Sequence, residues 1–255
     1  MDNAAFLISS ASDWLLSGLS GTRHVSPPTW AYWHARFMVI GWTILLPSGM
    51  LIARFFKVTS RQAWPTVLDN KFWWKCHIRL QSAGLVFVFL GLAMVYRHGK
   101  GISSLAMMHH LCGWFVIVMG IIQLISGLLR GSKGGPTSAN MRGDHYDMTP
   151  RRVLFEYVHK ILGWIAMAVA AFVTGAGLVL VDAPRWMMIV IALWWIAYLL
   201  VFAWLQAKGR CLDTYQAIWG ASLEHPGNQL KPIGWGIRRR GSPKENGSKG
   251  LPPRE

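Results

Sequence analysis

The chain is short of charged residues, and of acidic residues above all. Lysine, arginine, aspartate and glutamate make up 15% of its 255 residues, and only 11 residues are acidic. A soluble domain has about 25% charged residues, whereas 53% of this chain is hydrophobic. This composition argues against an ordinary water-soluble domain and favours a protein embedded in a membrane.

Cysteine is scarce as well, because the chain has only Cys76, Cys112 and Cys211. Their spacing does not resemble a metal site, and nothing in it implies a disulfide. The first residues also lack a basic stretch followed by a short apolar stretch, so we expect no cleaved signal peptide. Any metal-binding or catalytic side chains of this protein are therefore expected among residues other than cysteine.

In place of charge, the chain has five apolar segments that are long enough to cross a bilayer. A spanning helix needs about 20 predominantly apolar residues. Aromatic residues cluster at the segment ends, as an interfacial aromatic belt requires. We therefore predict an all-α integral membrane protein with five transmembrane helices, at about Trp30–Phe55, Phe72–Tyr96, Ser103–Leu129, Val153–Val181 and Trp186–Ala207.

The net charge of +15 could indicate a nucleic-acid partner, but the distribution of lysine and arginine argues against one. These residues concentrate between segments one and two, between segments three and four, and after segment five. The other side of the membrane has few, at Arg23, Arg97, Lys100 and Arg185. Cytoplasmic loops carry the excess of basic residues. We therefore predict a plasma or inner membrane protein with its N-terminus outside, its C-terminus cytoplasmic, and lipid as a partner.

This topology divides the chain into three regions. Residues 1–29 form an outer-face segment, in which Asn3–Gly21 could be a short interfacial helix or an ordered cap on the outer loops. Residues 30–207 form the transmembrane domain. Residues 208–255 form a basic cytoplasmic tail, which we expect to be mobile near its end.

Four of the five segments carry histidine near their start, and the fifth has none. These residues are His34, His77, the adjacent His109 and His110, and His159. A polar group in hydrocarbon must be satisfied and is usually functional. Since successive helices run in opposite directions, His34 and the histidine of segment three lie toward the outer face. His77 and His159 then lie toward the inner face.

Two imidazoles from facing helices are what a six-coordinate haem iron needs. One pair on each side of the membrane predicts two b-type haems in a four-helix core, with one extra helix. We expect both haems to be bound without covalent attachment, because the sequence has no C-x-x-C-H motif.

The candidate ligands stand in two repeated motifs. H-x-R-x4-G occurs at His34, Arg36 and Gly41 and again at His77, Arg79 and Gly84. H-x3-G-W occurs at His109, Gly113 and Trp114 and again at His159, Gly163 and Trp164. The glycine at the seventh position after histidine falls on the histidine face of the helix. A flat macrocycle could press against the backbone there, and close helix packing is the alternative.

The second motif also distinguishes the two adjacent histidines. His109 is in register with His159, whereas His110 is turned by about 100° around the helix. Gly127 and Gly177 extend the repeat, since each follows its histidine by 18 residues, or about five turns. We therefore predict His109 as the ligand, with His110 as the fallback.

The motifs "HARFMVIGWTILLPSGMLIAR", "HIRLQSAG", "HHLCGWFVIVMGIIQLISG" and "HKILGW" resemble the cytochrome b561 superfamily, in particular its bacterial b561-domain proteins. The resemblance covers about residues 30–207. It implies a four-helix core with two b haems, one held by His34 and His109 and the other by His77 and His159. It also implies electron transfer across a membrane.

Basic and amide residues near the ligands have two interpretations each. Arg36, Arg79, Arg54 and Lys160, with Arg130 and Lys100, could neutralise haem propionates or grip an anionic substrate, or they could reach toward lipid headgroups. Gln81 and Gln123 could bond near the inner haem or a quinone, or join two helices.

The leading functional prediction is a di-haem b-type cytochrome that moves electrons from a reductant to an acceptor across the membrane. The reductant would be a quinol, another small donor, or a redox protein in the membrane or on its outer face. One alternative is a haem-binding accessory subunit of a larger respiratory or photosynthetic complex. Another is a transporter that uses buried histidines as proton relays. The sequence leaves the donor, the acceptor and the enzymatic status open.

The charge asymmetry makes a prediction about topology. A reporter that works only in the cytoplasm should be active when it is fused after Glu255, and a reporter that works only after export should be inactive there. The reason is that the basic segments stay on the cytoplasmic side. Paired fusions with a cytoplasmic and an exported reporter measure this. Activity of the exported reporter would reverse the topology and the side assigned to each histidine pair.

Overall fold

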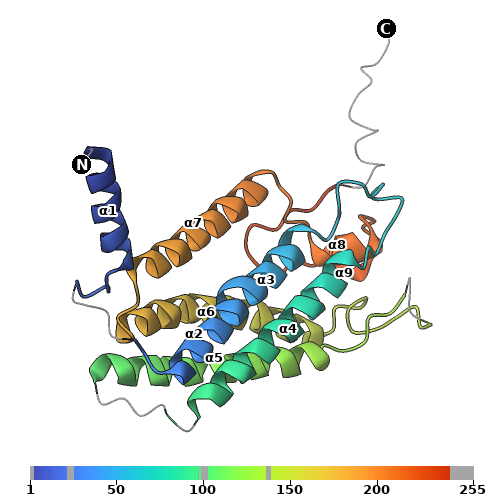
Figure 1. The fold of residues 1–255 in the computed structure, drawn as a ribbon. Coiled ribbons are helices and arrows are strands. Elements are labelled where there is room, and N and C mark those ends of the chain that lie inside the picture. Colours follow the sequence, from blue (N-terminus) through green and yellow to red (C-terminus); the bar gives the residue numbers. More distant parts are fainter. Residues whose placement is uncertain (1–2, 22–25, 97, 99–102, 136–138, 242–255) are drawn as a thin grey trace. The chain divides into compact units, whose positions relative to one another are not determined.

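The computed structural model describes residues 3–21, 26–96, 98, 103–135 and 139–241, and it describes side chains from residue 8 onward (Figure 1). Over these residues the chain is helical, and the only β-type pairings are two isolated bridges, Gly18 with Pro184 and Leu212 with Arg238. The predicted all-α class is therefore confirmed.

Within the described part of the chain, five helices are long and apolar enough to cross a membrane, in agreement with the predicted number of spans. The first span is continuous from Thr29 to Phe55 and consists of α2 (Thr29–Met38), η1 (Val39–Leu45) and α3 (Leu46–Phe55). The others are α4 (Phe72–Val95), α5 (Ser104–Leu128), α6 (Pro150–Leu180) and α7 (Arg185–Ala207). Their bounds lie within three residues of the predicted segments. The chain is an integral membrane protein.

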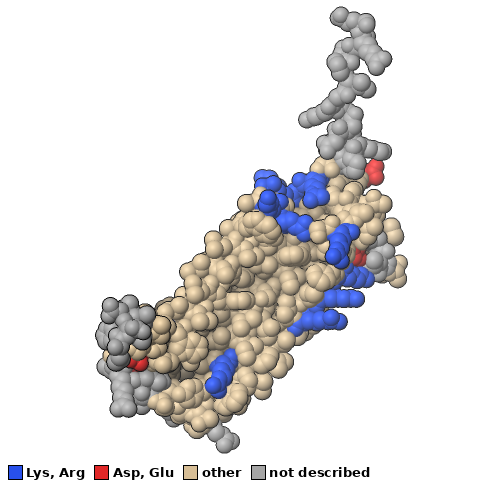
Figure 2. Space-filling view, turned by 45° about the horizontal axis from the view of Figure 1, so that its top comes forward, with Lys and Arg blue, Asp and Glu red and all other residues tan. Residues whose placement is uncertain are grey.

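The surface of the spans is rich in exposed apolar side chains. On α7, for example, Leu199 and Leu200 are 60% and 65% exposed, and Leu205 is the only buried residue of the helix. On the face shown in Figure 2, lysine and arginine gather in groups and leave a broad stretch without charge. Lipid chains accept such a surface, because burying apolar side chains in hydrocarbon avoids the cost of their exposure to water.

The described chain divides into two compact units, and each contains parts of the spanning helices. Unit 1 comprises Met1–Gly49, Arg79–Ile121 and Trp164–Phe202, and unit 2 comprises Met50–Ile78, Ile122–Gly163 and Ala203–Glu255.

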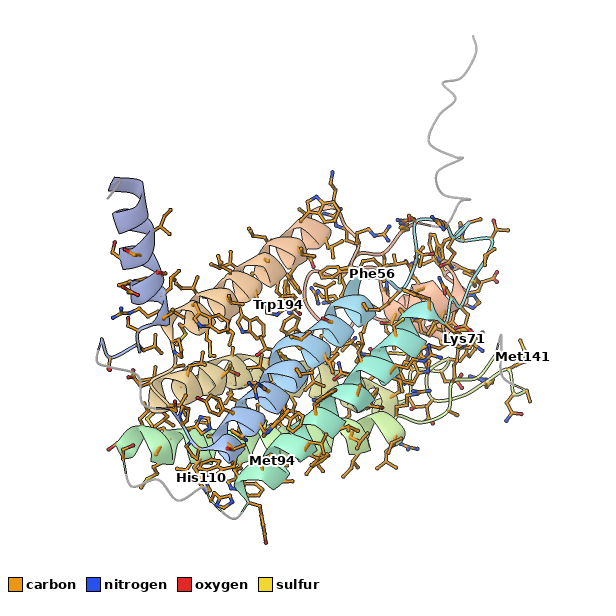
Figure 3. The ribbon with its side chains drawn as sticks, viewed as in Figure 1. Phe56, Lys71, Met94, His110, Met141 and Trp194 are labelled. Atoms are coloured by element: carbon orange, nitrogen blue, oxygen red, sulfur yellow. The ribbon has the colours of Figure 1, made fainter. Side chains whose placement is uncertain are left out.

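In unit 1, a proline changes the geometry of the first span. Pro47 has no N–H to donate to the carbonyl of Thr43, four residues earlier, and its ring crowds that carbonyl. The span is a π-helix over Val39–Leu45, which ends two residues before the proline. The indole N–H of Trp194 in α7 donates to the Thr43 carbonyl at 2.8 Å (Figure 3). Helix α7 thus supplies a donor to the carbonyl with which Pro47 cannot pair.

Small residues bring α4 and the first span into close contact in unit 1. A Cβ atom on Gly41 would lie 2.9 Å from the Gly84 carbonyl oxygen and 2.8 Å from a methyl of Val88. A Cβ atom on Gly84 would lie 2.8 Å from the Leu46 side chain. These contacts favour the helix-packing alternative for Gly41 and Gly84, since other helical atoms occupy the space beside them.

The N-terminal helix α1 (Asn3–Leu16) belongs to unit 1, and the residues that follow it bond to the turn between α6 and α7. The Leu19 N–H donates to the Ala183 carbonyl at 3.1 Å, and the Ser20 N–H donates to an Asp182 carboxylate oxygen at 2.7 Å. Residues 8–16 of the helix are all exposed, among them Ile8 at 69% and Trp14 at 53%. Its location in the membrane interface stays a prediction.

In unit 2, the basic tail is folded through residue 241, and its end, for which mobility is predicted, lies outside the described residues. It forms two short helices, α8 (Thr214–Trp219) and α9 (Pro226–Gln229). Tyr215, Ile218 and Trp219 form a buried cluster against Trp73, Tyr146 and Met148. The Trp219 indole N–H donates to Nδ1 of His145 at 3.2 Å. Burial, with the nearby Arg152 guanidinium adding to it, lowers the pKa of His145 to about 3, so this histidine is neutral.

Arg239 holds the tail together. Its Nε donates to the Asp213 carboxylate at 2.6 Å, and its other nitrogens donate to the carbonyls of Gly227, Asn228 and Leu230. Asp213 also caps α8 by accepting from the Tyr215 N–H.

Replacing Arg239 by alanine should therefore destabilise the tail by about 2 kcal/mol, because it leaves the mostly buried Asp213 carboxylate without its cation. Thermal unfolding and limited proteolysis of purified protein measure the loss. Lys231→Ala, at an exposed position, is the matched control. Equal melting temperatures for the two variants would contradict the assigned role.

Candidate functional site

The structure brings together the first pair of candidate ligands in unit 1. His34 lies on α2 and His109 lies on α5, and their ring centroids are 6.1 Å apart with an angle of 74° between the ring planes. Both side chains are half-buried. The pairing is the one that the helix directions predict.

The second pair lies in unit 2 and has nearly the same geometry. His77 on α4 and His159 on α6 have ring centroids 6.5 Å apart and an angle of 75° between their planes. Both are half-buried, and Phe155 lies against His159 at 5.2 Å between centroids.

These separations fit one metal ion between each pair of rings. An imidazole nitrogen binds a transition metal at about 2 Å, so two nitrogens on opposite sides of one ion lie about 4 Å apart and the ring centroids roughly 6 Å apart. Both observed separations agree with this value. Axial coordination of one iron by two imidazoles is therefore compatible with the residues present.

The hydrogen bonds of the His34/His109 pair indicate which ring nitrogen can bind a metal. Nδ1 of His34 lies 2.9 Å from the Gly91 carbonyl oxygen, and Nδ1 of His109 lies 3.1 Å from that of Val173. Since a carbonyl can only accept, each Nδ1 carries the proton and donates. Nε2 then keeps its lone pair for a metal, as in most metal-binding histidines.

Glycines of the repeat lie beside the rings of the opposite helix. A Cβ atom on Gly177 of α6 would lie 3.0 Å from Cε1 of His109, and one on Gly127 of α5 would lie 3.9 Å from Cε1 of His159. Among the described residues, no atom beyond the local helix backbone lies within 4 Å of a Cβ built on Gly113, and only Gln123, at 4.0 Å, approaches one on Gly163. The H-x3-G-W glycines thus leave space next to the ligands, and their contact with a cofactor stays a prediction.

His110 lies in a different environment from His109. Its side chain is exposed on α5 (Figure 3), and its ring centroid lies 6.3 Å from the half-exposed Trp114. This placement agrees with the register argument, which turns His110 away from the pair.

The predicted basic residues lie in two kinds of environment. Arg36 is exposed, with its guanidinium 5.2 Å from the ring centroid of Trp33, and Arg79 is exposed on α4. Arg54 donates to Gln206 and to the Trp235 carbonyl, and Lys160 donates to Glu156 and to the Ile233 carbonyl. Arg54 and Lys160 thus bind the tail. Any role of these four residues toward a cofactor stays a prediction.

The remaining polar predictions have separate outcomes. Arg130 lies over Trp74, with its guanidinium carbon 3.8 Å from the ring centroid. Gln81 donates to the Leu46 carbonyl at 3.0 Å within unit 1, which is the interhelical alternative. Gln123 of α5 donates to the His159 carbonyl of α6 at 3.0 Å, which is likewise an interhelical contact, beside the His77/His159 pair. Lys100 lies outside the described residues.

Sequence reasoning missed one polar residue at the His77/His159 pair. The hydroxyl oxygen of Ser126 lies 3.2 Å from Nδ1 of His159. Ser126 directly precedes Gly127 in the repeat, and this position was the signal that could have identified it.

Comparison with known proteins finds a family match over the part of the chain that contains three of the four paired histidines. Residues 33–142 match a family profile described as eukaryotic cytochrome b561. The matched residues include His34, His77 and His109, and His159 follows them. The predicted resemblance of residues 33–142 to the cytochrome b561 superfamily is therefore confirmed. The family that this profile describes implies b-type haem.

Curated relatives share the cytochrome b561 region over a part of their length. A cytochrome b561, DM13 and DOMON domain-containing protein of Arabidopsis thaliana is 31% identical over 144 residues, which is 56% of this chain and 14% of the relative. Ferric-chelate reductase 1 of Bos taurus is 29% identical and that of Homo sapiens 28% identical, each over 59% of this chain and 23% of the relative. The chain thus spans less than a quarter of these proteins. No solved structure gave a significant match.

The geometry predicts different results for the two adjacent histidines. Replacing His109 by alanine should release or weaken one haem and leave the other, because a strong axial ligand is lost. Replacing the exposed His110 by alanine should leave two haems, with at most a shift in one potential. Absorption spectra of the purified variants measure this. Loss of a haem in the His110 variant alone would show that helix α5 is rotated by about 100° from the assigned register.

Proposed function

We propose that the chain is a di-haem cytochrome that carries electrons across the membrane. His34 and His109 would hold one haem, and His77 and His159 the other. The observation that supports this most directly is the occurrence of two imidazole pairs, one in each unit, at separations of 6.1 and 6.5 Å.

The chain's own residues would position the cofactors and shield them from water. Each iron would supply one-electron chemistry by cycling between its ferrous and ferric states. Nδ1 hydrogen bonds to Gly91 and Val173 hold the outer imidazoles in one orientation, with Nε2 available for the metal. Apolar helix faces lower the local dielectric constant around the pairs, and axial ligation with burial sets the reduction potential. No proton transfer by a side chain is required.

The direction and the partners follow from the proposed topology. With the N-terminus outside and the C-terminus cytoplasmic, the His34/His109 pair lies toward the outer face and the His77/His159 pair toward the cytoplasm. The electron donor would be a quinol, another small reductant, or a redox protein in the membrane or on its outer face. The names of two relatives make a chelated ferric ion an acceptor to test.

Electron transfer across a sealed membrane tests the function. The haem-loaded protein is reconstituted into vesicles that contain ferricyanide, and an impermeant reductant is added outside. We expect ferricyanide to be reduced only in vesicles with haem-loaded protein. Bound haem that no donor reduces would instead support the accessory-subunit alternative, and protein without haem would support the transporter alternative.

The number of haems is a separate prediction. A pyridine haemochrome assay of fully loaded protein should give two haems per chain. His34→Ala and His77→Ala should each retain one, because each removes a ligand from a different pair. One haem per wild-type chain, or loss of both haems in either variant, would contradict the assignment of one haem to each unit.

A further inference from the structure

The second ring nitrogen of the candidate ligands does not have the same partner in the two units. In unit 1, Nδ1 of His34 and Nδ1 of His109 both face backbone carbonyl oxygens. In unit 2, Nδ1 of His159 faces the hydroxyl of Ser126 at 3.2 Å. No substitution removes a backbone carbonyl, whereas the Ser126 hydroxyl can be removed by replacing one side chain.

The direction in which the Ser126 hydroxyl donates is coupled to the tautomer of His159. The Ser126 oxygen also lies 3.1 Å from the Gln123 carbonyl oxygen, which can only accept a hydrogen bond. When the hydroxyl donates to that carbonyl, its oxygen accepts from the Nδ1–H of His159, and Nε2 keeps its lone pair. When the hydroxyl instead donates to Nδ1, Nε2 carries the proton and cannot bind a metal. Metal binding through Nε2 therefore selects the first arrangement.

The same turn of α5 also holds the backbone of α6 at this position. The Gln123 side chain donates to the His159 carbonyl at 3.0 Å. The next residue after Ser126 is Gly127, and a Cβ atom built on it would lie 3.9 Å from Cε1 of His159, at van der Waals contact. One turn of α5 thus fixes both the backbone and the ring of His159.

We propose that Ser126 is a positioning residue that orients His159 and lowers the reduction potential of the inner haem. This inference rests on the proposed function, because it assumes that His159 is an axial ligand. An acceptor at Nδ1 makes the imidazole a more basic ligand and stabilises the ferric state. Removal of the hydroxyl should therefore shift the inner potential to more positive values.

The experiment is a spectroelectrochemical titration of the full, haem-loaded chain. Ser126→Ala is made in the wild type, in His34→Ala, which keeps the inner haem, and in His77→Ala, which keeps the outer haem. We expect a positive shift of the inner midpoint potential in the first two backgrounds and no shift of the outer potential in the third.

Two further variants separate tuning from a general structural effect. Ser126→Thr keeps the hydroxyl and should keep the wild-type potential. Ser48→Ala makes the same chemical change at a hydroxyl that bonds the Ile44 carbonyl of its own span, at 2.6 Å, and should change neither potential. If Ser126→Ala loses the inner haem while Ser126→Thr and Ser48→Ala keep both, the positioning role is supported as well.

The contradicting results are distinct from a failure of the proposed function. Two haems with an unchanged or more negative inner potential in Ser126→Ala would overturn the inference, and so would an equal shift of both potentials. A wild-type chain with fewer than two haems would instead overturn the proposed function on which the inference rests.

Discussion

The structure depends on the requirement that an imidazole placed among apolar helices has a partner for its Nδ1–H. An unsatisfied buried donor costs about 1–3 kcal/mol, and hydrocarbon offers no water to reduce that cost. His34 and His109 meet this requirement with helical carbonyls, and His159 meets it with a hydroxyl. A helical carbonyl oxygen has two lone pairs and can accept from the imidazole in addition to its own helix.

Close approach of the helices follows from this requirement. An imidazole on α5 reaches a carbonyl on α6 only where the facing surface has no side chain. Gly177 provides this surface beside His109, since its Cβ would lie 3.0 Å from the ring. Gly41 and Gly84 lie where the first span packs closely on α4. Glycines at similar positions in the motifs therefore have different neighbours: a histidine ring in one case and a packed helix in the other.

The spans and the histidine pairing could be predicted from the sequence because both depend on simple periodicities. Apolar length gives the spans, and a histidine near the start of four successive helices gives alternating depth. The packing role of Gly41 could not be predicted, because a facing helix and a flat cofactor both favour glycine on that face. The contact between Ser126 and His159 depends on the rotation of two helices, which no spacing within one helix determines.

The tail shows another limit of sequence reasoning. Its composition predicts a mobile end, which lies outside the described residues, but it does not predict the folded part that extends to residue 241. The interactions that order it, such as Asp213 with Arg239 and Trp219 with His145, join residues 26 and 74 positions apart. Amino-acid composition does not predict such pairs, because each partner alone resembles an ordinary polar or aromatic loop residue.

The central claim is that each unit holds one haem iron between two imidazoles whose planes are close to perpendicular. Low-temperature electron paramagnetic resonance of the oxidised, haem-loaded protein tests this most directly. Two strong axial ligands make ferric iron low-spin, and ring angles of 74° and 75° should give two strongly anisotropic low-spin signals. A high-spin ferric signal from intact protein, or a single low-spin centre, would contradict the account.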